Sequence, residues 1–139
     1  MSTSVANFAM TLPMALVVAA NSAEYEQIAH SLQPFYRMLK ATSLGEATMH
    51  LQHLQPAVVV LDPDLPDGDG MEWLRYLRSN PATWDLVIAC VTHRSTVRDK
   101  VSGFIAGADD YVIYPIDLET FGYRVTLLAR IGRHSVWKR

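Results

Sequence analysis

Cysteine is nearly absent from this chain of 139 residues, and that scarcity excludes several kinds of protein. The one cysteine, Cys90, lies inside the apolar run 86–91, so no disulfide can form within the chain and a buried, inert thiol is expected. A reducing cytoplasm fits such a chain. No zinc-ligand or nucleophile-base constellation is present, and we expect four histidines to be solvated: His30, His50, His53 and His134.

Long apolar runs and a large charge excess are also lacking. No run approaches the roughly 20 residues that a membrane-spanning helix needs. Residues 1–13 contain no Lys or Arg and are interrupted by Thr11 and Pro13, so they lack the pattern of a signal peptide and are expected to form a flexible leader. A net charge of -2 argues against a surface built to neutralise phosphates. We therefore expect neither membrane insertion nor direct nucleic-acid contact.

What the chain does contain is an alternation of short apolar runs with amphipathic segments, which is typical of a parallel sheet buried on both faces. Strands are expected at residues 14–19, 37–42, 57–61, 86–91 and 110–113. Helices are expected at residues 22–32, 44–54, 71–78, 95–106 and 117–133, with Ser22 and Asp117 as N-caps. The pattern predicts one α/β domain over residues 14–133, followed by a tail or the start of a linker at 134–139.

Asp62 is the first candidate functional residue. It directly follows the apolar run 57–61 and precedes a turn rich in Pro and Gly. Ligands of open α/β sheets bind beyond the carboxyl ends of the strands, so we expect a crevice beside Ala19, Ala20 and Asp62. The structural alternative is a turn-initiating carboxylate that binds backbone amides of its own loop.

The chain resembles the CheY-like receiver domain of two-component response regulators over about residues 14–133. Asp62 with Leu65-Pro66 and Gly70 matches the phosphoacceptor strand and loop, and Thr92 matches the hydroxyl after the fourth strand. The run 107–111 followed by Pro115 matches the fifth strand, in which Tyr111 would be the aromatic switch. The resemblance implies a flavodoxin-like (βα)5 doubly wound parallel sheet of strand order 2-1-3-4-5, and phosphoryl transfer to Asp62 from a sensor histidine kinase.

Three departures from the family pattern make this an atypical receiver. Family receivers carry an acidic pair after the first strand, where this chain has Ala19-Ala20-Asn21. They carry a lysine just before the proline of the fifth strand, where this chain has Tyr114. Tyr114 is either a half-exposed core residue or a hydroxyl donor to Asp62 in the place of the lysine. His93 stands where the family has a small residue, so its imidazole is expected over the acceptor.

These departures affect the expected chemistry. Phosphoryl transfer depends on positioning and on neutralising charge, which Mg²⁺ usually supplies through near-octahedral oxygen ligands. Asp62, Asp64 and Asn21 remain as oxygen ligands, so at most a weak magnesium site is expected. Loss of the lysine removes a Coulomb attraction of about 4 kcal/mol at contact for an effective dielectric near 20. We expect self-phosphorylation of Asp62 to be slow or absent, and no other enzyme activity.

The resemblance also implies an output face made by the fourth helix, the fifth strand and the fifth helix. Lys100, Asp110 and Arg124 match charged positions through which receivers of the winged-helix regulators form symmetric dimers. Exposed charge pairs contribute only about 0 to 1 kcal/mol each, so an apolar patch has to supply the affinity. Its expected members are Val97, Val101, Phe104 and Phe121.

Three functional hypotheses follow. The leading one is an atypical receiver that acts as an interaction and homodimerisation module, with weak or absent phosphorylation of Asp62. The second is a working phosphoacceptor that takes its phosphoryl group from a histidine kinase through a rebuilt magnesium site. The third is a small-molecule sensor that uses the volume left by Ala19 and Ala20.

Overall fold

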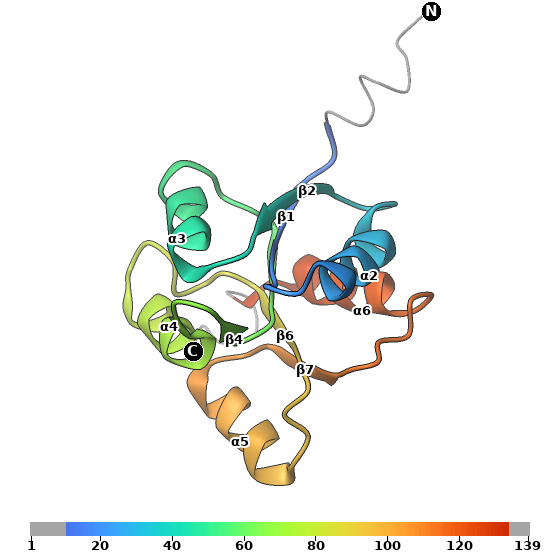
Figure 1. The fold of residues 1–139 in the computed structure, drawn as a ribbon. Coiled ribbons are helices and arrows are strands. Elements are labelled where there is room, and N and C mark those ends of the chain that lie inside the picture. Colours follow the sequence, from blue (N-terminus) through green and yellow to red (C-terminus); the bar gives the residue numbers. More distant parts are fainter. Residues whose placement is uncertain (1–10, 134–139) are drawn as a thin grey trace, which may run out of the picture.

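The computed structural model describes residues 11–133, which form one parallel sheet with helices on both faces (Figure 1). The sheet order is β2-β1-β3-β6-β7, so the predicted order 2-1-3-4-5 is confirmed. The sheet strands are β1 (Met14–Val18), β2 (Arg37–Ala41), β3 (Val58–Leu61), β6 (Ile88–Thr92) and β7 (Asp110–Ile113). The helices are α2 (Ser22–Leu32), α3 (Leu44–His53), α4 (Gly70–Ser79), α5 (Val97–Ala106) and α6 (Phe121–Ile131).

The central strands separate two apolar cores because successive side chains of a strand point to opposite faces. On β1, Ala15 and Val17 face the core under α2 and α6, whereas Leu16 and Val18 face the core under the other helices. In Figure 1, α2 and α6 lie on one side of the sheet and α3, α4 and α5 on the other. All four residues of β3 are fully buried, so the Asp62 that follows is fixed by a rigid strand.

Two helix N-termini differ from the sequence expectation. Asn21, and not Ser22, is the N-cap of α2, and its side chain accepts a hydrogen bond from the Glu24 amide. Asp117 does not cap a long last helix; its carboxylate accepts from the Glu119 amide in a turn, and α6 begins at Phe121. An Asx turn satisfies amides within two residues, which competes with helix initiation at the same point.

A small antiparallel hairpin was not expected from the sequence. It pairs β4 (Asp64–Leu65) with β5 (Gly68–Asp69) in the loop between β3 and α4. Strands of two residues carry no readable periodicity, because alternation needs at least four residues. The hairpin holds the segment after Asp62 in one conformation at the carboxyl edge of the sheet.

The leader predicted for residues 1–13 lies outside the described residues except for its last three. The carbonyls of Leu12 and Pro13 accept hydrogen bonds from the side chain and the amide of Arg37. The tail predicted for residues 134–139, with His134, also lies outside the described range. Within residues 11–133, no helix has the length and apolar character needed to cross a bilayer.

Candidate functional site

Asp62 lies at the carboxyl end of β3 with its side chain in a buried position. The residue is 5 % exposed, and its amide donates to the carbonyl of Val18 at 2.9 Å. Its Oδ1 accepts a hydrogen bond from the Asp64 amide at 3.1 Å. This is the bond to its own loop that is expected of a turn-initiating carboxylate. The following turn is tight: a Cβ on Gly70 would stand 2.6 Å from the Cα of Pro63.

Tyr114 reaches Asp62 from the end of β7. Its hydroxyl donates to Asp62 Oδ2 at 3.0 Å, so the expected hydrogen bond is present. Burial raises the pKa of Asp62, an effect that the hydrogen bonds from Asp64 and Tyr114 only partly oppose. Burial, together with the negative charge of Asp62, also raises the pKa of Tyr114. A neutral phenol, rather than a cation, therefore contacts the carboxylate.

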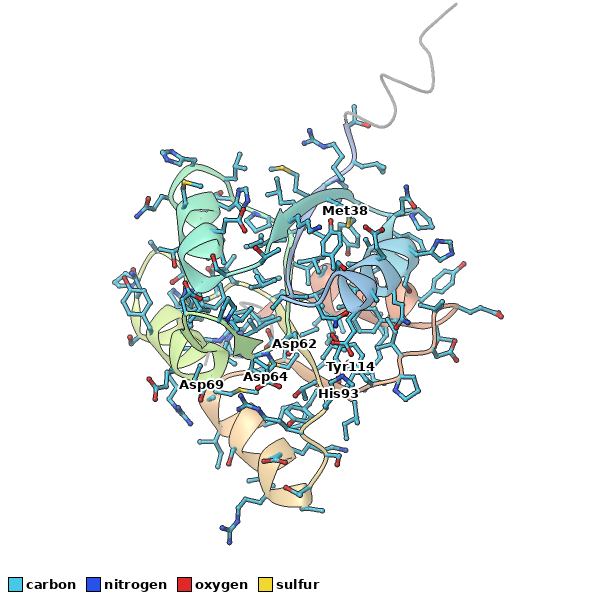
Figure 2. The ribbon with its side chains drawn as sticks, viewed as in Figure 1. Met38, Asp62, Asp64, Asp69, His93 and Tyr114 are labelled. Atoms are coloured by element: carbon cyan, nitrogen blue, oxygen red, sulfur yellow. The ribbon has the colours of Figure 1, made fainter. Side chains whose placement is uncertain are left out.

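His93 packs against Tyr114, whose hydroxyl binds Asp62. The two ring centroids are 4.5 Å apart, and His93 Nε2 is hydrogen-bonded to Glu24 Oε2 of α2. The side chains labelled in Figure 2 show Asp62, Tyr114 and His93 together at the carboxyl edge of the sheet, with Met38 far from them. His93 thus packs on the ring of Tyr114, and its bond to Glu24 connects this ring to α2.

Thr92 and Tyr111 both contact the backbone of Arg94 in the loop after β6. Thr92 is fully buried, and its Oγ1 accepts from the Arg94 amide at 3.0 Å. Tyr111 points inward and is 4 % exposed, and its hydroxyl donates to the Arg94 carbonyl at 2.8 Å. Its ring lies so close to α5 that a Cβ on Gly103 would stand 2.6 Å from two ring carbons. The candidate switch residue is therefore in a buried position in contact with α5.

The oxygen ligands expected for a weak magnesium site have other partners. Asp64 binds the guanidinium of Arg94, with the shorter N–O distance at 2.7 Å, and Asn21 caps α2. Ala19, where the family places a carboxylate, is fully buried. Among residues 11–133, no group of three or more His, Cys, Asp or Glu side chains is arranged to hold a metal ion. Mg²⁺ is usually held by one or two carboxylates with waters and phosphate oxygens, and here the oxygens of Asp64 and Asn21 are engaged within the chain.

The residues expected for dimerisation lie on α5, β7 and α6, but two of them are paired within the chain. Arg124 donates both Nε and Nη2 to the carboxylate of Asp110, which is 9 % exposed. Lys100 is exposed on α5. Of the expected apolar patch, Val97, Val101 and Phe104 are exposed. The expectation for Phe121 is wrong: it is 2 % exposed because it faces the core under α2 and α6.

Sequence reasoning missed Arg94 and Glu24 at this site. Arg94 donates to Asp64 and Asp69, and Glu24 binds His93. The sequence signal for Arg94 was its place two residues after Thr92, at the edge where the carboxyl ends of the strands meet. A basic residue at this position faces the acidic loop across the crevice.

Comparison with known proteins identifies the family. The model of the response regulator receiver domain matches residues 16–126. This chain is a response regulator receiver domain. It is 36 % identical over 100 residues to the transcriptional regulatory protein BasR of Escherichia coli K12, covering 72 % of this chain and 43 % of BasR. With the KDP operon transcriptional regulatory protein KdpE of the same strain, the identity is 34 %, covering 71 % of this chain and 42 % of KdpE.

A solved receiver structure agrees with the fold. The receiver superimposes on a putative response regulator from Chloroflexus aurantiacus J-10-fl with a TM-score of 0.81 at 27 % identity, covering 86 % of this chain and 99 % of the other. The chain spans less than half the length of the curated relatives BasR and KdpE. It therefore carries the receiver part of two-component signalling, and the output of those longer relatives is not assigned to it.

Proposed function

We propose that this receiver works in the cytoplasm mainly as a protein-interaction and dimerisation module, and that Asp62 is phosphorylated slowly or not at all. The observation that carries the proposal is the hydrogen bond of 3.0 Å from Tyr114 to Asp62 Oδ2. This bond joins Asp62, the candidate phosphoacceptor, to Tyr114, which stands where family receivers carry a lysine. Its partners would be a sensor histidine kinase, another partner protein or a second copy of the chain.

The chemistry of acceptor phosphorylation supports this proposal. An attacking carboxylate oxygen needs an open approach to phosphorus and cations to neutralise the transferred charge. At Asp62, Oδ1 accepts from the Asp64 amide and Oδ2 accepts from the Tyr114 hydroxyl. A phenol cannot supply the positive charge of an ammonium, and removal of one preorganised charge-stabilising group commonly lowers a rate about 100-fold or more. Loss of both the lysine and the acidic pair should therefore leave little self-phosphorylation.

The face of α5 supports an interaction role. Four apolar side chains with helical spacing are exposed along this helix: Val97, Val101, Phe104 and Ile105. Ile105 is 78 % exposed, and such an apolar stripe bordered by charged residues is typical of a binding surface. The Asp110–Arg124 ion pair joins β7 to α6. We assign dimerisation, or binding of a partner protein, to this face.

Intact-mass spectrometry after incubation with acetyl phosphate tests the phosphorylation arm. The protein is incubated with and without Mg²⁺, next to an Asp62→Asn control. We expect no gain of a phosphoryl mass beyond that of the control. A stoichiometric, Mg²⁺-dependent gain within minutes that is absent from Asp62→Asn would overturn this arm and support the alternative of a working phosphoacceptor.

Sedimentation equilibrium tests the interaction arm. Ile105→Glu places a charge on the exposed stripe of α5, and Met49→Glu places the same charge on α3, where Met49 is 52 % exposed. We expect the wild type and Met49→Glu to form the same dimer and Ile105→Glu to be monomeric at equal concentration. If the wild type is a dimer and Ile105→Glu leaves it intact, the α5 face is not the interface.

A further inference from the structure

The guanidinium of Arg94 lies among the carboxylates of the loop that follows Asp62. Its Nε and Nη2 donate to Asp64 Oδ1 at 3.2 and 2.7 Å, and Nη2 lies 3.3 Å from Asp69 Oδ1. Asp69 Oδ1 also accepts from the Met71 amide at 2.9 Å, as the N-cap of α4. One guanidinium therefore joins the loop after β6 to both β4 and the beginning of α4.

The backbone of Arg94 is held by two other residues of the site. Its amide donates to Thr92 Oγ1, and its carbonyl accepts from the hydroxyl of Tyr111. The ring of Tyr111 packs against Gly103 of α5, with no room for even one additional carbon. A shift of the Arg94 backbone would therefore change the position of a ring that contacts the proposed interaction helix.

We propose that Arg94 is the built-in cation of the Asp62 crevice, and that it positions Tyr111 against α5 in the absence of a phosphoryl group and a metal ion. Arg94 is a positioning residue, since it acts through Asp64, Asp69 and Tyr111. The inference rests on the proposed function, in which the α5 face is maintained without phosphorylation. It explains how the loop after Asp62 stays connected to α5 while the oxygens of Asp64 and Asn21 are engaged within the chain.

The electrostatics of the crevice agree with this role. Burial alone would lower the pKa of Arg94, but the hydrogen bond with Asp64 and the charges of Asp64 and Asp69 raise it. The side chain of Arg94 is 32 % exposed, so its charge is only partly screened by solvent. Part of the negative charge of the two carboxylates that would otherwise attract a divalent cation is thus offset from within the chain. Their release should make the crevice more attractive to Mg²⁺.

The test is a titration of the full chain of 139 residues with Mg²⁺, followed by NMR of backbone amides and of the Tyr111 ring. Four proteins are compared. Arg94→Gln removes the charge, and Arg94→Lys retains it. Arg75→Gln removes an arginine charge from the exposed surface of α4 as a matched control, and the wild type is the reference. Because the side chain of Arg94 is 32 % exposed and fills no part of the apolar cores, all four proteins should fold.

We expect Mg²⁺ to move the amide resonances of Asp64 and Asp69 in Arg94→Gln at a concentration at least about tenfold lower than in the wild type. Arg94→Lys and Arg75→Gln should titrate like the wild type. Without Mg²⁺, the Tyr111 ring and the Gly103 amide should shift in Arg94→Gln and remain unchanged in Arg75→Gln. Equal Mg²⁺ affinity in Arg94→Gln and the wild type would refute the built-in cation, and unchanged Tyr111 and Gly103 resonances would refute the positioning role.

Failure of the inference can be told apart from failure of the proposed function. The titration reports on Arg94 whether or not Asp62 accepts a phosphoryl group, and the mass measurement reports on Asp62 whether or not Arg94 is replaced. Phosphorylation of the wild type with an unchanged Arg94→Gln titration would refute both. An unphosphorylated wild type whose Arg94→Gln variant gains no Mg²⁺ affinity would refute the inference alone.

Discussion

Tyr114→Phe removes a single hydroxyl, and we expect it to destabilise the protein measurably at neutral pH. The hydroxyl donates to Asp62 at 3.0 Å, and Asp62 is almost fully buried. The ring itself remains, so its contact with His93 and its apolar area are kept. The variant therefore loses only one hydrogen bond to the carboxylate. Water can replace that bond only poorly, because Asp62 is buried.

The magnitude follows from the charge and the burial of the acceptor. A hydrogen bond to a charged group contributes about 1.5–3 kcal/mol to stability, and the burial of Asp62 makes this range appropriate. For a domain of this size, each kcal/mol corresponds to about 4 °C in the melting temperature. Tyr114→Phe should accordingly lower Tm by about 6–12 °C at pH 7.

Thermal unfolding followed by circular dichroism at pH 7 measures this loss, and Asp62→Asn supplies the second side of a double-mutant cycle. With a neutral acceptor, the cost of Tyr114→Phe should decrease to about 0.5–1.5 kcal/mol. Tyr123→Phe is the matched control, because Tyr123 is 67 % exposed on α6, and its replacement should change stability by less than about 0.5 kcal/mol.

The reasoning would be refuted by a Tyr114→Phe protein that melts within about 1 °C of the wild type at pH 7. It would also fail if the cost of Tyr114→Phe were the same with aspartate and with asparagine at position 62. Either result would mean that the Tyr114 hydroxyl does not stabilise the charged Asp62 carboxylate. The proposed function would then lose its main support.

Two further predictions concern Asp62 and the switch tyrosine. Because burial raises the pKa of Asp62 above its ordinary value of 3.8, the folded state retains its proton to higher pH than the unfolded state, and stability is lost as pH rises through that interval. Asp62→Asn should therefore stabilise the protein at pH 7, with an advantage in urea unfolding that shrinks as the pH falls toward 3.8; a constant advantage would contradict the raised pKa. Gly103→Ala should cost about 1–3 kcal/mol in the same assay, since its Cβ would meet the Tyr111 ring at 2.6 Å, and full stability with an unmoved Tyr111 would contradict this packing.

The fold was predictable because its signals are repeated along the chain. Strand β3 is an uninterrupted apolar run bounded by Pro56 and Asp62, and its counterparts recur at regular intervals. The N-caps were predicted less well, because Asn21 and Ser22 are both good capping residues and only the backbone geometry decides between them. The short hairpin β4–β5 was not predictable, since each of its strands has only two residues.

The site was predictable only where a single position carried the signal. Tyr114 was expected near Asp62 from its place before Pro115, and the structure shows their hydrogen bond. Arg94 was not expected, because its partner Asp64 lies 30 residues away and the position after Thr92 shows only that Arg94 lies near the crevice. Pairings of this kind depend on which loops meet at the sheet edge, and therefore on the completed fold.

If Asp62 is a poor phosphoacceptor, as proposed above, its engagement by Tyr114 also affects how easily mutation could restore that chemistry. A carboxylate at position 19 alone would enter a fully buried site beside Asp62, and two like charges there would repel each other without a cation. A lysine at position 114 alone would remove the phenol that now satisfies Asp62, while the metal ligands would still be missing. Each first step is disfavoured until the other has occurred, so the two positions are epistatic. Under the proposed function, the Tyr114–Asp62 contact would thus hinder a stepwise recovery of phosphoacceptor chemistry.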